Sequence, residues 1–93
     1  MTWDVQFTNA AAKQAKSLPQ SISERLMALV QALKFSGPAQ PTMPNYGKIK
    51  GQKETHHCHL KKGKPTYVAV WEAFKATKKV VMTYVGTHEN APY

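Results

Sequence analysis

One apolar stripe in the N-terminal half constrains the fold of this chain more than any other feature. Its members recur at the spacing of a single helix face: Ile22, Leu26, Leu29, Val30 and Leu33. Residues 21–24 (SISE) match a capping box that would begin this helix, and residues 36–38 (SGP) would end it. A helix with one apolar face needs a second layer to cover that face, so the rest of the chain has to supply one.

A strand and a shorter helix are expected before this stripe. Residues 3–7 (WDVQF) alternate apolar and polar side chains, as a half-buried strand does. Thr8 or Asn9 would cap a helix that starts at the alanines 10–12. The pair Leu18-Pro19 would end that helix, because proline cannot continue a helix interior.

The second half of the chain predicts the covering layer, a set of short strands. Strand-like runs occupy residues 46–50, 55–60, 65–73 and 79–85, and short polar or glycine-containing segments separate them. Links this short require antiparallel pairing between neighbours. Residues 36–45, with three prolines and a glycine, are expected to form an ordered connector. We therefore predict one α+β domain over residues 1–93, with two N-terminal helices on one face of a small antiparallel sheet.

Composition limits the compartment and the class of protein. The longest apolar runs are about five residues, far short of the roughly 20 that a membrane span needs. The N-terminal residues lack the pattern of a secretory signal. A single cysteine, Cys58, cannot form an internal disulfide, which is typical of a reducing compartment. A cytoplasmic protein that does not act at a membrane is expected.

Charge gives the first indication of function. Thirteen Lys and Arg residues against five Asp and Glu give a net charge of +8. Residues 45–64 hold six lysines and three histidines but only one acid, Glu54. A field of this sign attracts polyanions such as RNA, DNA or an acidic protein. The alternative is that the lysines only keep a small domain in solution.

Three histidines fall in the strand expected at residues 55–60. Alternation along a strand would turn His56, Cys58 and Leu60 toward the helices. His57, His59 and Lys61 would then form a row on the uncovered face. Three interpretations of this row remain open: a zinc site, for which Cys58 points the wrong way; a solvated polar strand; and an anion site whose groups also move protons.

The order of elements resembles the RelE/ParE superfamily of bacterial toxins, the partners of antitoxins in toxin–antitoxin operons. Three segments carry the resemblance: KQAKSLPQSISERLMALVQAL, HCHLKKGKPTYVAVWE and, most specifically, VVMTYVGTHENAPY. It spans nearly the whole chain and is nearest to the RelE-like ribonuclease branch. The resemblance implies cleavage of mRNA in the ribosomal A site. It also implies an acidic antitoxin as partner, no membrane, and no direct DNA binding by the toxin alone.

The resemblance and the chemistry of RNA cleavage together select candidate site residues. His88 matches the catalytic position that follows the family's last strand, and Tyr93 matches its C-terminal aromatic residue. We expect His88 to be the general acid and His57 or His59 to be the base, with Glu89 as a rival base. Lys61 and Lys50 would stabilise the phosphorane, and Tyr93 would stack on a base or orient the phosphate. The expected RNA-binding residues are Tyr46, Lys48, Lys53, Lys62 and Lys64.

Two features separate this chain from the expected pattern or from other nucleases. The family usually has an arginine early in its penultimate strand, where this chain has Tyr67 and Val68, so lysine and histidine would have to contact the phosphate. Attack by the 2′-hydroxyl of RNA needs no metal, and five scattered carboxylates cannot build a two-metal nuclease, so no metal and no cofactor is expected. Two alternatives to the ribonuclease stay open: a ParE-like inhibitor of DNA gyrase, and an inactive relative that only binds RNA or antitoxin.

Overall fold

The computed structural model describes residues 2–49, 54–61, 63 and 65–92. The helices are α1 (Asn9–Lys16) and α2 (Gln20–Ser36), and two short 3₁₀ helices are η1 (Lys75–Thr77) and η2 (His88–Asn90). The strands are β1 (Asp4–Phe7), β2 (Gly47–Lys48), β3 (Thr55–Lys61), β4 (Tyr67–Phe74) and β5 (Lys79–Thr87). The α+β architecture predicted from the sequence is confirmed.

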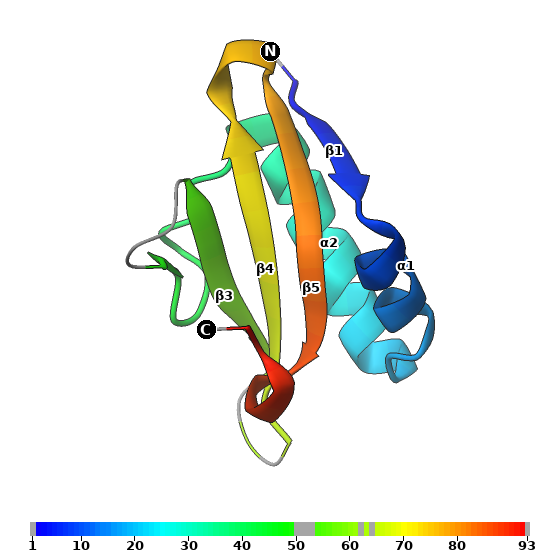
Figure 1. The fold of residues 1–93 in the computed structure, drawn as a ribbon. Coiled ribbons are helices and arrows are strands. Elements are labelled where there is room, and N and C mark those ends of the chain that lie inside the picture. The colour runs from blue at the N-terminus through cyan, green and yellow to red at the C-terminus, as the bar shows by residue number, and fades with distance from the viewer. Residues whose placement is uncertain (1, 50–53, 62, 64, 93) are drawn as a thin grey trace.

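The described strands form one sheet in the order β1-β5-β4-β3-β2 (Figure 1). Strands β2 to β5 pair antiparallel, as the short links between them predict. Strand β1 instead lies parallel to β5, so the expectation of a purely antiparallel sheet is wrong at this edge. The two strands are separated by most of the chain, and a long connection permits parallel pairing where a short one does not.

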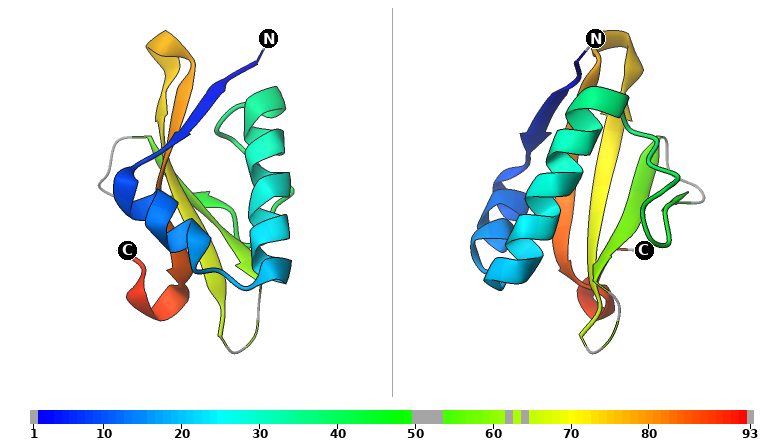
Figure 2. Two further views of the ribbon diagram at one scale, coloured as in Figure 1. Left: turned by 90° about the vertical axis from the view of Figure 1, so that its right-hand side faces the viewer. Right: turned by 180° about the vertical axis from the view of Figure 1, so that it is seen from behind.

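Helix α2 crosses the rear of the sheet, and α1 lies beside β5 (Figures 1 and 2). Thr8 caps α1 as expected: its Oγ1 accepts a hydrogen bond from the Ala11 N–H at 3.1 Å. The capping box predicted for α2 is wrong, because the helix begins at Gln20 with Pro19 as its N-cap, two residues before the predicted N-cap Ser21. The Pro19 carbonyl accepts from the Ile22 and Ser23 N–H groups at 3.0 and 2.9 Å, so the first turn needs no side-chain cap.

The core lies between α2 and the rear face of the sheet. The predicted stripe is buried along its whole length, and its five members are at most 5% exposed. Across from it, the sheet contributes Cys58, Leu60, Ala69, Trp71, Val80, Met82 and Val85. The predicted direction of Cys58 and Leu60 is thus confirmed. Burying one such aliphatic side chain contributes about 1.5–3 kcal/mol, so this layer is the main source of stability.

The connector after α2 is ordered and holds strand β3 in place. Gln40, only 5% exposed, donates to the Gly37 and Ala32 carbonyls at 2.8 and 3.2 Å. The indole of Trp71 donates to the Pro38 carbonyl at 3.0 Å. The His59 N–H donates to the Pro44 carbonyl at 2.8 Å, so the connector covers the outer edge of β3. The expectation of an ordered connector is confirmed.

The face of the sheet away from α2 is not simply solvated. His57 pairs with Val70 and His59 pairs with Val68, so all four side chains share that face. Val68 and Val70 are 0% and 1% exposed although α2 packs on the opposite face of the sheet. The face therefore carries a small apolar layer beneath its polar side chains, which the sequence-based expectation of a water-exposed face did not include.

Candidate active site

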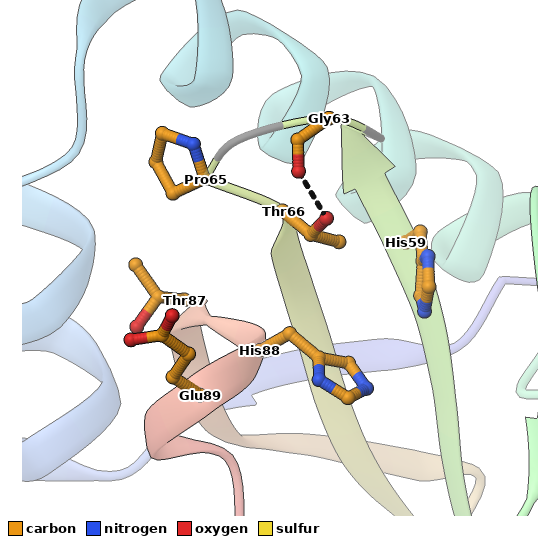
Figure 3. A pocket seen from close by; sticks show the side chains of 7 residues that line it. All are labelled: His59, Gly63, Pro65, Thr66, Thr87, His88 and Glu89. Carbon is orange, nitrogen blue, oxygen red and sulfur yellow. Dashed lines mark hydrogen bonds between the residues drawn. The ribbon is translucent and has the colours of Figure 1, made fainter.

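Two histidines from distant parts of the chain meet on the face away from α2. His59 extends from β3, and His88 is the first residue of η2, just after β5. Their ring centroids are 5.6 Å apart, and the ring planes meet at 71°, an edge-to-face contact. Figure 3 shows the His88 side chain extending from η2 toward the His59 side chain on β3. The structure thus brings together two of the histidines that the sequence analysis selected.

The histidine pair opens onto a cleft between η2 and the β3–β4 connection (Figure 3). Its volume is about 730 Å³, which lies within the range of small-ligand sites. The described residues that line it are His59, Gly63, Pro65, Thr66, Thr87, His88 and Glu89. The Thr66 hydroxyl donates to the Gly63 carbonyl at 2.6 Å and holds the wall opposite η2.

His57 lies one step along the same face of β3. Burial lowers the pKa of this imidazole below 6.5, and the nearby charge of His88 lowers it further. His57 is therefore a neutral imidazole at pH 7, a form that accepts a proton. Its Nε2 would be 3.5 Å from a Cβ placed on Gly47, an ordinary van der Waals contact, so the ring lies beside β2. His57 does not line the cleft.

His56 lies on the helix side of the sheet in an aromatic stack with Tyr46 and Trp71. Its ring is parallel to the Trp71 indole, with a centroid distance of 6.0 Å and an angle of 3°. The Tyr46 hydroxyl is 2.8 Å from His56 Nδ1, and His56 Nε2 is 3.5 Å from the Glu54 carboxylate. Burial lowers the pKa of His56, although Glu54 opposes this shift, so the ring is neutral at pH 7. The Glu54 carboxylate beside Nε2 favours the tautomer with its proton there, which leaves Nδ1 to accept from the Tyr46 hydroxyl.

Tyr46, which the sequence analysis selected as an RNA-binding residue, lies away from the histidine pair. It packs against the core on the side of the sheet opposite the histidine pair. Burial raises the pKa of its hydroxyl, and the negative charge of Glu54 raises it further. Its place in the stack makes it a packing residue.

The expected row of His57, His59 and Lys61 is interrupted. The β3–β4 register shifts between His59 and Lys61, so strict alternation fails at this bulge. Lys61 is exposed and is not among the described residues that line the cleft. Sequence reasoning cannot locate such a shift, because it assumes an unbroken period of two.

Lys48 is also away from the histidine pair. It pairs with His56 in the β2–β3 register, which places it on the helix side of the sheet edge. Its Nζ is 3.4 Å from the Glu54 carboxylate, which also contacts Lys75 at 3.6 Å. The remaining candidates, Lys50, Lys53, Lys62, Lys64 and Tyr93, lie outside the described residues.

Cys58 cannot join His57 and His59 in a zinc site. Cys58 is fully buried on the helix side, opposite His57 and His59, and burial raises the pKa of its thiol to about 12. Among the residues that the structure describes, no three His, Cys, Asp or Glu side chains are grouped as metal ligands would be. In the same part of the chain, no helix has the length and apolar character needed to cross a membrane.

Sequence reasoning missed several residues that shape the cleft. Pro65 and Thr66 form one wall, and the pairing of Tyr67 with Thr87 brings that wall next to η2. The sequence signal that could have pointed to this wall is the segment KPT, residues 64–66, just before β4. Tyr84 was also missed: its hydroxyl donates to the Thr87 carbonyl at 2.7 Å, immediately before His88.

Comparison with known proteins finds similarity in structure only. No protein-family model matches the chain, and no curated protein matches it by sequence. Among solved structures, a substituted free RelE toxin from E. coli matches with a TM-score of 0.78 and 19% identity, over 98% of this chain and 88% of that one.

Two further matches come from other organisms. RelE in the RelE–RelB complex of Pyrococcus horikoshii matches with a TM-score of 0.74 and 16% identity, over 98% of this chain and 100% of that one. The YoeB dimer of Staphylococcus aureus matches with a TM-score of 0.75 and 10% identity, over 95% and 99% of the two chains. The chain described here therefore has the fold of the RelE/ParE superfamily of toxins.

Proposed function

We propose that this protein is the toxin of a toxin–antitoxin pair and that it cleaves mRNA in the ribosomal A site. The observation that carries the proposal is the edge-to-face pair of His59 and His88 at the mouth of a cleft. The chain shares its fold with RelE and YoeB toxins, so we assign it to the same class of protein. The net charge of +8 suits a polyanionic substrate.

The chemistry that we propose uses the 2′-hydroxyl of the RNA as the nucleophile. A base removes its proton, the oxygen attacks the adjacent phosphorus, and an acid protonates the departing 5′-oxygen. The products are a 2′,3′-cyclic phosphate and a 5′-hydroxyl. Two imidazoles, one neutral and one protonated, supply both proton transfers without a metal ion.

We assign the acid to His88 and the base to His59, because both line the cleft and His57 does not. Acid and base must act on opposite sides of the phosphorus. A phosphate between two rings needs a hydrogen bond of about 2.8 Å on each side in addition to its own width. Centroids 5.6 Å apart leave no such space, so the rings have to separate when substrate binds.

The partner that we propose is an acidic antitoxin. Complexes of RelE with RelB are among the matching structures, and one of them holds RelE with a peptide of its antitoxin. An acidic segment that binds the positively charged surface would compete with RNA for the same lysines. Co-expression with the product of an adjacent short, acidic reading frame should abolish the growth arrest that this protein causes alone.

The experiment that tests the proposed activity is a translating extract in which the ends of the mRNA are mapped. We expect cuts in phase with codons, and we expect His88→Asn or His59→Asn to slow cleavage by about 10²–10⁴-fold, the usual contribution of a general acid or base. Asn90→Ala, an exposed substitution in the same short helix, is the matched control.

Three outcomes would contradict the proposal. Intact message together with inhibited gyrase supercoiling would indicate a ParE-like inhibitor. Bound but uncleaved message would indicate an inactive relative. Cleavage of a message with a 2′-deoxy residue at the cut site would exclude the 2′-hydroxyl mechanism.

A further inference from the structure

The peptide group between Thr87 and His88 is held at both of its polar ends. The His88 N–H donates to the Thr66 carbonyl at 2.8 Å, which ties it to the start of β4. The Thr87 carbonyl accepts from the Tyr84 hydroxyl at 2.7 Å, which ties it to a side chain three residues earlier in β5. One peptide plane with two fixed ends has little freedom to rotate, and its orientation fixes the N–Cα bond of His88, from which the side chain extends.

Gly86 leaves room for the second of these bonds. A Cβ on Gly86 would lie 2.8 Å from the Tyr84 hydroxyl oxygen and 3.1 Å from Cζ, so the tyrosine ring passes directly over the glycine. Its φ is not in the left-handed region, so the side chain of Tyr84, and not the backbone geometry, is what a Cβ at this position would meet. Tyr84, Gly86 and Thr87 thus act together: the Tyr84 ring lies over Gly86, and its hydroxyl reaches the Thr87 carbonyl.

We propose that Tyr84 is a positioning residue that orients His88 toward His59, and that Gly86 admits the Tyr84 ring. The consequence for catalysis rests on the proposed function, but the positioning itself does not. Tyr84 does not line the cleft with His59 and His88, so it acts on the reaction only through the Thr87–His88 peptide. Misplacement of a reacting group by about 1 Å can cost as much as 10²-fold in rate.

The structural test is nuclear magnetic resonance of the histidine rings in the full chain. In the wild type we expect cross-relaxation between ring protons of His59 and His88, whose rings are in contact. Tyr84→Phe should abolish or strongly weaken this signal and shift the His88 ring resonances. Tyr67→Phe, which removes a half-buried hydroxyl from the adjacent strand and leaves both ties intact, should not.

Gly86→Ala tests the same tie from the other side. The added methyl group should push the Tyr84 ring off the Thr87 carbonyl and reproduce the Tyr84→Phe spectrum. In the double variant the hydroxyl is already absent, so we expect the spectral change and the rate loss of one single variant and not their sum. If the rate losses of Tyr84→Phe and Gly86→Ala added up in the double variant, Tyr84 and Gly86 would not act through the same hydrogen bond.

The kinetic test uses ribosome-bound message. Tyr84→Phe should lower kcat by at least about tenfold with KM unchanged, because the residue positions a proton donor and does not bind RNA. An unchanged His59–His88 signal in Tyr84→Phe would overturn the positioning proposal whatever the kinetics show. A wild type that cleaves nothing would instead overturn the proposed function, and the ring signals would still decide the role of Tyr84.

Discussion

Tyr46→Phe tests whether Tyr46 binds RNA, as the sequence suggested, or stabilises the fold through its contact with His56, as the structure indicates. The substitution keeps the aromatic ring and removes only the hydroxyl that lies 2.8 Å from His56 Nδ1. His56 is 2% exposed, so its Nδ1 would remain buried without that partner. Leaving a buried acceptor unpaired costs about 1–3 kcal/mol. For a domain of this size each kcal/mol lowers Tm by about 4–8 °C.

Urea unfolding followed by tryptophan fluorescence measures this loss directly. Trp71 stacks on both Tyr46 and His56, with centroid distances of 6.3 and 6.0 Å, so its emission reports on the stack. Tyr67→Phe, which removes a half-buried hydroxyl outside the stack, is the control. Tyr46→Leu should lose about 0.5–1.5 kcal/mol more than Tyr46→Phe, since it also removes the ring contacts.

RNA cleavage by Tyr46→Phe, measured well below its Tm, should equal that of the wild type. Tyr46 packs on the helix side of the sheet, away from the cleft. If Tyr46→Phe kept full stability, the hydrogen bond to His56 would carry none of the energy assigned to it. If Tyr46→Leu also lost RNA affinity while remaining folded, the placement of Tyr46 outside the RNA-binding surface would be wrong.

Three further outcomes follow from the same contacts. The free energy of unfolding should fall as the pH drops below 6.5, because His56 and His57 have lowered pKa values in the folded chain and the unfolded chain takes up their protons first. Tm measured between pH 8 and pH 5 checks this, and His57→Asn should flatten the profile. Thr8→Ala should cost about 0.5–2 kcal/mol in urea unfolding through loss of the α1 cap. Binding to a 2′-deoxy RNA analogue should weaken steeply with added salt, and a salt-independent affinity would argue against phosphate contacts.

Local periodicity made much of the fold predictable. The stripe on α2 and the alternation of Cys58 and Leu60 in β3 depend only on the repeat of a helix and of a strand, and both are confirmed. The capping box at residues 21–24 was wrong because the helix begins at Gln20, which places Ser21 inside its first turn and not at the N-cap. Sequence patterns predict which face a residue takes better than where an element begins.

Non-local pairing explains what could not be predicted in the site. The bulge between His59 and Lys61 removes Lys61 from the histidine row, and nothing in the residues 59–61 announces it. The burial of Val68 and Val70 beneath the uncovered face depends on which strands are neighbours. His88 could be selected from the sequence as a candidate, but its contact with His59 requires β5 to end beside the β3–β4 connection.

Strand β5 connects the core to the cleft, and its two halves have different surroundings. Its first half, from Lys79 to Met82, lies between β1 and β4, and Val80 and Met82 are fully buried. Its second half extends beyond β1, and there the side chain of Gln14 in α1 accepts from the Val85 N–H at 3.2 Å in place of a strand partner. The same stretch pairs with β4 through Gly86 and Thr87 and leads directly into His88. Because the first half is fixed by the core and the second by Gln14 and β4, the position of His88 depends on packing far from the cleft. Substitutions in α1 should therefore alter the histidine pair without contacting it, as long as they disturb Gln14.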